Sequence, residues 1–218
     1  TLSDGREVEG RVAFHHKPGH GGGPGGGGDP APTTQCFAFL AKDAEWKVTE
    51  PYLLNPANVD GMSDSFVADT IAAGITEWES QVNFDIFGAG SLTGDVLSAD
   101  FDSPDEQNEV YFAPIEDEGV IAFTLTWGIF KGPPFARELV EWDMVFDDAD
   151  FDWGDASLDA SLMDLQNIGT HEQGHAAGLA HPEDTCLDET MYRFAQEGET
   201  KKRDVNAGDI AGVQKLYN

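Results

Sequence analysis

Residues 170–194 read THEQGHAAGLAHPEDTCLDETMYRF and contain three of the six histidines in the 218-residue chain. The residues before this stretch continue into it and predict a helix over 161–178, which Gly178 can close in a left-handed backbone conformation. Residues four positions apart lie on the same face of a helix. The sequence therefore predicts that His171 and His175 project together and that the bend after Gly178 brings His181 back to them.

Three neutral imidazoles suit zinc and leave a fourth coordination position open, which is typical of catalytic rather than structural zinc sites. The predicted ligands of one catalytic zinc ion are His171, His175 and His181. Glu172 follows the first ligand directly, so we expect it to neighbour the metal rather than to bind it. A carboxylate in that position can accept a proton from activated water and pass it to a leaving amine. The pattern predicts a zinc-dependent endopeptidase that acts on proteins or peptides, with Glu172 as general base.

The run H-E-x-x-H-x-x-G-x-x-H at 171–181, followed by Met191, resembles the metzincin metallopeptidases. Within that clan the chain is most similar to the matrixins, because of Met191-Tyr192, the ending GDIAGVQKLYN and a diffuse likeness from residue 46 onward. The resemblance implies an α+β catalytic domain with a mixed, twisted five-stranded sheet and three helices. It also implies that Met191 forms an apolar floor beneath the zinc ion.

The same resemblance concerns substrate binding. It implies that GVIAFTLTW, residues 119–127, forms the upper rim of the cleft and that an extended peptide pairs with its exposed edge. Ile121 and Ala122 are the expected backbone contacts. Tyr192 and Phe194 would wall an apolar space beside the zinc ion, which would prefer a bulky apolar side chain just after the cut. Ordinary core packing of these aromatic residues is the alternative.

Two features differ from animal matrixins and concern further metal ions. The sequence has no histidine between His20 and His171, and Val145 stands where a structural zinc ligand would precede a Phe-Asp pair. We therefore expect no second zinc ion. Asp147 and Asp150 match the spacing of calcium-binding carboxylates in the resemblance, so calcium is a second candidate ion.

The two cysteines, Cys36 and Cys186, lie 150 positions apart. They form either one disulfide or two buried free thiols. A disulfide closing so long a loop contributes about 4–5 kcal/mol in the loop-entropy model and indicates an oxidising compartment. We favour the disulfide, which predicts a secreted, extracellular or cell-surface protein. Cys36 does not lie in the Pro-Arg-Cys-Gly context of the matrixin latency switch, and pairing with Cys186 would tie the N-terminal region to the wall of the metal site.

Residues 1–35 differ from the rest in composition and are predicted to be an N-terminal extension to a peptidase domain over 36–218. The segment KPGHGGGPGGGGDPAPTT, residues 17–34, is a low-complexity linker that should lack regular structure. Before it, REVEGRVAFHH at 6–16 alternates weakly and indicates a short strand.

Three further histidines lie near this linker, and we expect His15, His16 and His20 to be loose surface residues. A pro-segment is the alternative. In that case the glycine-rich stretch would lie in the cleft and one of these histidines would cap the zinc ion.

The charge balance is acidic, with 12 Lys and Arg against 41 Asp and Glu and a net charge of −29. Repulsion disfavours binding to nucleic acid and to anionic lipid. No apolar run reaches about 18 residues, so no membrane insertion is expected. We interpret the charge as a solvated surface, with calcium binding by some acidic clusters as the alternative, and we expect a monomer.

Other elements follow from periodicity. Spacings of three and four predict helices over 63–82, capped by Ser63, and over 206–218. Runs rich in β-branched and aromatic residues predict strands at 36–40, 48–55, 84–88, 109–115, 120–127 and 138–146.

Two other functions stay open from the sequence. One is a calcium-rich binding or surface-layer domain without turnover, although such a domain has no need of Glu172. The other is a zinc peptidase of a different clan, with Glu197 or Glu199 as third ligand in place of His181.

Overall fold

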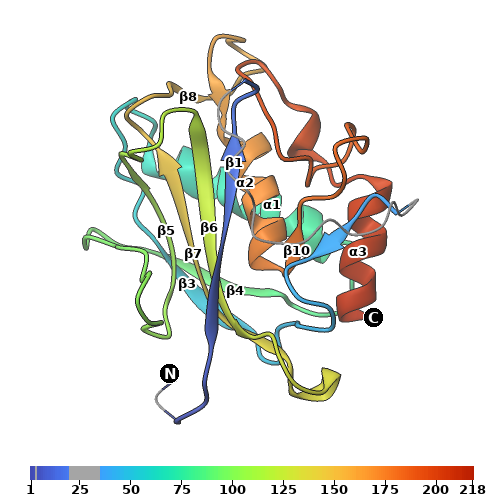
Figure 1. Cartoon of the computed structure of the whole chain (residues 1–218). Coiled ribbons are helices and arrows are strands. Elements are labelled where there is room, and N and C mark those ends of the chain that lie inside the picture. The colour runs from blue at the N-terminus through green and yellow to red at the C-terminus, as the bar shows by residue number, and fades with distance from the viewer. Residues whose placement is uncertain (3, 20–34) are drawn as a thin grey trace.

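The computed structural model describes residues 1–2, 4–19 and 35–218 (Figure 1). Its main sheet has the strand order β1-β6-β7-β5-β3-β4. The strands of this sheet are β1 Glu9–His16, β3 Glu50–Leu54, β4 Phe87–Leu92, β5 Asn108–Ala113, β6 Val120–Ile129 and β7 Glu138–Asp147. Four shorter strands form two small sheets, with β2 Ala38–Phe39 beside β10 Leu179–Ala180 and β8 Trp153–Gly154 beside β9 Met163–Asp164.

The α-helices of the described residues are α1 Asp64–Glu79, α2 Leu165–Ala176 and α3 Ala207–Tyr217. Short 3-10 turns, η1 Pro134–Ala136 and η2 Lys201–Arg203, lie in the connections. The predicted α+β class, the mixed sheet and the three helices are confirmed. The five strands β3 to β7 form the sheet that the sequence led us to expect, and β1 adds a sixth.

The sheet is mixed because β6 is the one strand of this sheet that runs in the opposite direction to the others. β3, β4, β5 and β7 are parallel to one another, whereas β6 is antiparallel both to β7 and to β1. Without β1, strand β6 would be the edge of the sheet, with a row of unpaired backbone groups. Figure 1 shows β1 running beside β6 along this edge.

Helix α1 begins as the sequence predicts. The Ser63 side chain accepts a hydrogen bond from the Phe66 backbone N–H, which satisfies one of the free donors of the first turn. The apolar stripe then faces inward, and its buried members are Val67, Ile71, Ile75 and Trp78. A stripe at this spacing stabilises the helix mainly through packing.

Helices α1 and α2 pack closely. The Trp78 indole donates to the Thr170 carbonyl at 2.7 Å, and the Gln173 side-chain amide donates to the Ile71 carbonyl at 2.8 Å. A Cβ atom at Gly74 would lie 2.2 Å from the Gln173 Oε1 atom, so a larger residue would have to displace the Gln173 side chain that bonds to α1. The fixed contact with α1 holds α2, and with it the metal-site motif, against the sheet.

The two faces of the sheet are covered differently. The helices pack on one face over the main apolar core, while a second apolar cluster lies on the other face. This second cluster contains Phe123, Leu125, Trp127 and Val145 from the sheet and Ala99 from the loop after β4. Val145 is therefore a core residue of the face turned away from α2.

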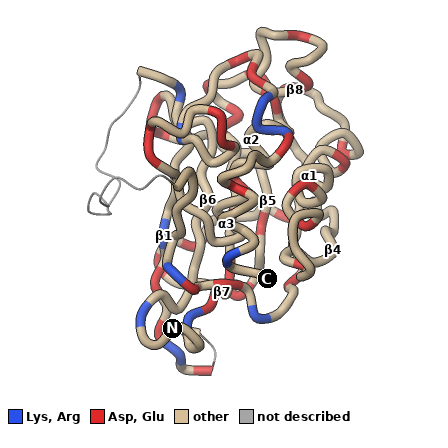
Figure 2. The backbone as a smooth tube through the Cα atoms, turned by 90° about the vertical axis from the view of Figure 1, so that its right-hand side faces the viewer, with Lys and Arg blue, Asp and Glu red and all other residues tan. Residues whose placement is uncertain are grey.

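The acidic charge lies mostly on connections. Figure 2 shows Asp and Glu along several loops and at helix ends, while Lys and Arg appear at few positions. Among the described residues, no helix combines the length and the apolarity needed to cross a bilayer.

Candidate metal centre

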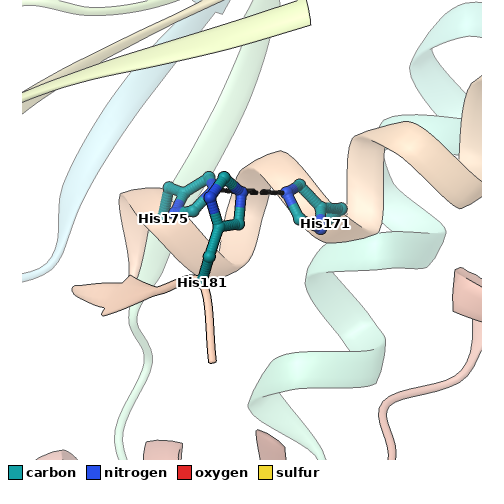
Figure 3. A group of neighbouring side chains, drawn as sticks. All are labelled: His171, His175 and His181. Carbon is teal, nitrogen blue, oxygen red and sulfur yellow. Dashed lines mark hydrogen bonds between the residues drawn. The ribbon is translucent and has the colours of Figure 1, made fainter. Parts of the chain in front are cut away.

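Helix α2 and the turn after it bring three histidines together. His171 and His175 lie one turn apart on α2, whose last residues are followed by Gly178 with a φ of 101°. This left-handed residue ends the helix and redirects the chain through β10 to His181. Figure 3 shows the three imidazoles pointing toward one another.

The triad has the spacing of a metal site. The three Nε2 atoms lie 3.1, 3.1 and 3.2 Å apart. Nitrogens at tetrahedral positions around one zinc ion would lie about 3.3–3.4 Å apart, given zinc–nitrogen distances of about 2.0–2.1 Å. The residues present therefore fit a zinc ion, and the group His171, His175 and His181 could hold one.

The remaining ring nitrogens fix the orientation of two imidazoles. Nδ1 of His171 lies 2.6 Å from the Thr190 carbonyl, and Nδ1 of His175 lies 2.9 Å from the Leu179 carbonyl. Donation from Nδ1 leaves the lone pair of Nε2 facing the centre of the triad. Burial lowers the pKa of His175 to about 4 and that of His171 well below its usual range. The rings are thus neutral, as metal ligands must be.

Glu172 lies beside the triad and is fully buried. Its Oε2 atom accepts a hydrogen bond from the Thr124 hydroxyl at 2.7 Å, whereas its Oε1 atom has no hydrogen-bond partner among the described residues. Burial raises the pKa of the carboxyl to about 8, although the Thr124 hydrogen bond opposes this shift. A carboxyl with such a pKa can exchange a proton near neutral pH.

Met191 packs directly against the metal-site helix. It is 1% exposed, and a Cβ atom at Gly174 would lie 2.1 Å from its sulfur and 2.7 Å from Trp78. Gly174 directly precedes His175. A side chain at this position would collide with Met191 and Trp78, so the close packing requires a glycine. Met191 therefore packs on α2 at a position between its two histidines, and its role as the floor of the site stays an expectation.

Replacing Gly174 with Ala should destabilise the fold by about 1–3 kcal/mol, because the added methyl group overpacks a site with no free space. Differential scanning calorimetry would measure the change in melting temperature. Gly94→Ala is the matched control, since a Cβ atom there meets nothing within 4 Å. Equal melting temperatures for the two variants would contradict the close packing of Met191 on α2.

Asp209, at the start of α3, holds the turn that carries Met191. It is fully buried and accepts hydrogen bonds from the backbone N–H groups of Thr190, at 2.5 Å, and Met191, at 3.3 Å. The Thr190 carbonyl in turn contacts His171. Sequence reasoning missed both Asp209 and Thr124, because neither lies near the motif in the chain.

The disulfide between Cys36 and Cys186 is present, with Cα atoms 5.5 Å apart. The alternative of two free thiols is therefore wrong. The bond lies next to the pairing of β2 with β10, so residue 36 is tied to the loop between His181 and Met191.

The predicted substrate edge is covered. Ala122 of β6 pairs with His15 of β1, and the β1 strand predicted at 6–16 is confirmed over Glu9–His16. His15 is fully buried, so the expectation of a loose surface residue is wrong there. The reason is that strand pairing places it on the covered face of the sheet. His16 is half-buried, and His20 and the linker lie outside the described residues.

Lys202, in η2, is a further residue that sequence reasoning missed. It is fully buried, its Nζ atom lies 2.9 Å from Nε2 of His15, and it donates to the Tyr192 carbonyl. Burial lowers its pKa to about 7. The Lys202 amine thus lies beside His15, which itself stacks on His171, and Tyr192 and Phe194 are half-buried.

Glu197 and Glu199, the alternative third ligands, do not group with the three histidines. Glu197 pairs with Lys17 at 2.5 Å. Among residues 1–2, 4–19 and 35–218, the three-ligand groups are the histidine triad, a group of His15 with His171 and Glu172, and an acidic group of Asp100, Asp105 and Glu141. His181, rather than a downstream glutamate, thus completes the triad.

Comparison with known proteins agrees with this geometry. The family model described as Matrixin matches residues 44–218. A protein named Metalloendoproteinase 1-MMP from Arabidopsis thaliana is 42% identical over 55 residues, which cover 25% of this chain and 14% of that protein. Metalloendoproteinase 4-MMP from the same plant is 37% identical over 68 residues, or 31% of this chain and 18% of that protein. Since the match to the family model includes the triad, the Met191 turn and all of β3 to β7, the chain belongs to the matrixin family.

Proposed function

We propose that this chain is a zinc-dependent endopeptidase with Glu172 as general base. The three ligands of one catalytic zinc ion are His171, His175 and His181. The observation that carries the proposal is the triangle of Nε2 atoms, 3.1–3.2 Å on each side, beside a fully buried carboxylate. The matrixin match and the names of the two plant relatives support the same reaction class.

His171, His175 and His181 would hold the zinc ion, which would supply Lewis-acid chemistry toward a carbonyl group and a water molecule. The chain supplies the proton transfer. Oε1 of Glu172 is free to take a proton, because Oε2 is already bound by Thr124. The carboxylate can hold that proton and then deliver it to the leaving amine.

The test combines metal content with cleavage. Elemental analysis of the purified chain should give one zinc ion per chain, and a quenched peptide and unfolded casein should be cut in a chelator-sensitive way. The unchanged chain and the His15→Ala variant are both assayed, because His15 faces Glu172. A chain that holds one zinc ion and cuts neither substrate in either form would favour the binding-domain alternative instead.

Calcium is the second ion of the proposal. The sequence indicated Asp147 and Asp150, but the geometry favours the acidic group of Asp100, Asp105 and Glu141. Glu141 is fully buried and its Oε1 atom has no hydrogen-bond partner among the described residues, which is also true of Oδ2 of Asp147, but only the group with Glu141 brings three carboxylates together. Carboxylate oxygens are the ligands that calcium prefers, and a bound cation would compensate this buried charge.

The pH dependence of stability tests this acidic group. Burial raises the pKa of Glu141 from 4.5 to about 8 and that of Asp143 from 3.8 to about 8. The folded chain thus binds more protons than the unfolded chain. The two raised pKa values therefore stabilise the folded chain fully below about pH 4, and this stabilisation is lost as the pH rises to about 8. Without calcium, the melting temperature should therefore fall between these values. Adding calcium should raise the melting temperature more at pH 8 than at pH 5.

The control for this measurement is Glu141→Gln, which removes the ionisable group. Its melting temperature should depend less on pH and on calcium. If Glu141→Gln leaves the calcium response unchanged, calcium does not bind at Glu141, and Asp147 becomes the next candidate ligand.

Secretion, or display at the cell surface, is part of the proposal and is supported by the disulfide, since such bonds persist in oxidising compartments. We expect a monomer that acts on proteins or peptides and not on nucleic acid, as the net charge of −29 indicates. Immunodetection of the chain in the culture medium of its source cells and light scattering would check both points.

A further inference from the structure

The C-terminal end of β1 is held on both sides. On one side it is antiparallel to β6, with His15 opposite Ala122. On the other side the His16 N–H donates to the Arg193 carbonyl at 3.2 Å, and the Ala195 N–H donates to the His16 carbonyl at 3.2 Å. We call the position between β6 and residues 193–195 the peptide slot.

The strand register decides which β1 side chains face the metal centre. Residues directly opposite each other in an antiparallel pair have side chains on the same face of the sheet. Thr124, two positions from Ala122, contacts Glu172 and so marks the α2 face. His15 is opposite Ala122 and points to this face, while Phe14 points away and is 42% exposed. A slip of one residue would remove His15 from the centre.

The His15 ring closes the space around the general base. It stacks on His171 with 3.8 Å between ring centroids, and its Nδ1 atom lies 3.4 Å from Oε1 of Glu172. Its Nε2 atom lies 2.9 Å from Nζ of Lys202. Both His15 and Glu172 are 0% exposed, so with β1 in place the carboxylate is shielded from solvent.

We propose that residues 9–16 are an intramolecular peptide ligand that fills the peptide slot in place of a substrate, with Lys202 anchoring His15. This inference rests on the proposed peptidase function. The chain is then latent until β1 leaves. β1 and the slot belong to one chain, and the disulfide at Cys36 fixes the far end of the connection at the metal-site wall. A tethered ligand of this kind acts at an effective concentration of about millimolar, so even weak strand pairing blocks the slot.

The test uses full-length chains with single changes. His15→Ala removes the ring and the Lys202 contact, whereas His15→Gln keeps an acceptor for Lys202. Val96→Ala is the control, because that side chain is 95% exposed on the loop between β4 and β5 and belongs neither to β1 nor to the slot. Circular dichroism and the intact disulfide verify folding of each variant.

The first readout needs no activity. Amide hydrogen exchange is measured on the zinc-free chains over residues 120–128. His15→Ala should speed exchange by about tenfold or more at those amides of this segment that face β1, since local opening of β1 exposes them, while the amides that face β7 stay protected. Val96→Ala should leave the rates near those of the unchanged chain, and the rates of His15→Gln should lie between those of the unchanged chain and of His15→Ala. Equal exchange rates in all four chains would overturn the proposal.

The second readout is cleavage of a quenched peptide by zinc-loaded chains. His15→Ala should raise kcat/KM by about tenfold or more, because the fraction of chains with an open slot rises. The free peptide EGRVAFHH should inhibit this variant competitively, and EGRVAFAH should inhibit it less. An unchanged kcat/KM together with no inhibition by either peptide would overturn the proposal. Faster exchange in His15→Ala without cleavage by any chain would support a displaceable strand and contradict the peptidase function instead.

Discussion

Replacing Glu172 with Gln is expected to lower kcat/KM for a peptide substrate by about 10²–10⁴-fold while zinc content stays at one ion per chain. The amide keeps the shape of the carboxyl and can still accept the Thr124 hydrogen bond of 2.7 Å. It cannot take the proton that peptide hydrolysis releases from water. Loss of rate without loss of metal would therefore show that Glu172 transfers a proton and is not needed to bind zinc.

The rates are best compared in the His15→Ala chain, where the peptide slot is expected to be open, and then in the unchanged chain. Asp188→Asn is a suitable control, because it also removes one negative charge but lies exposed on the loop between His181 and Met191. Its kcat/KM should match that of its parent. Activity that survives Glu172→Gln would show that another group accepts the proton and would contradict the proposed mechanism.

Replacing Cys186 with Ser is expected to lower the free energy of unfolding by about 2–5 kcal/mol. The disulfide closes a loop between positions separated by 150 residues, so its loss frees a large part of the unfolded chain. For a chain of this size the melting temperature should fall by about 4–20 °C. Because residue 186 lies between His181 and Met191, the loop that carries the third histidine should also open more often.

Calorimetry without reductant measures this change, and zinc titration of the variant measures the effect on the triad. The double variant Cys36→Ser, Cys186→Ser controls for any reaction of the remaining thiol and should be as unstable as the single variant. Reductant should lower the melting temperature of the unchanged chain and leave that of the double variant unaffected. A melting temperature that no variant changes would show that the disulfide adds nothing to stability.

The sequence alone determined the features that depend on neighbours in the chain. Helical spacing placed His171 and His175 on one face, and Gly178 provided the turn to His181, because helix geometry and left-handed backbone are local properties. The Ser63 cap and the apolar stripe of α1 are local in the same sense. With only two cysteines in the chain, a single pairing was possible.

Tertiary structure decided what surrounds these features. Pairing of β1 with β6 joins residues more than a hundred positions apart, and nothing in REVEGRVAFHH specifies its partner or its register. That register buries His15 and covers the edge that the sequence left free for a substrate. Thr124 and Lys202 reach the metal centre only because β6 and η2 pack around α2. Periodicity predicts which face of a segment is buried, but the identity of the opposing side chain depends on packing between segments that are distant in the chain. That packing places both Thr124, which bonds Glu172, and His15, which covers it.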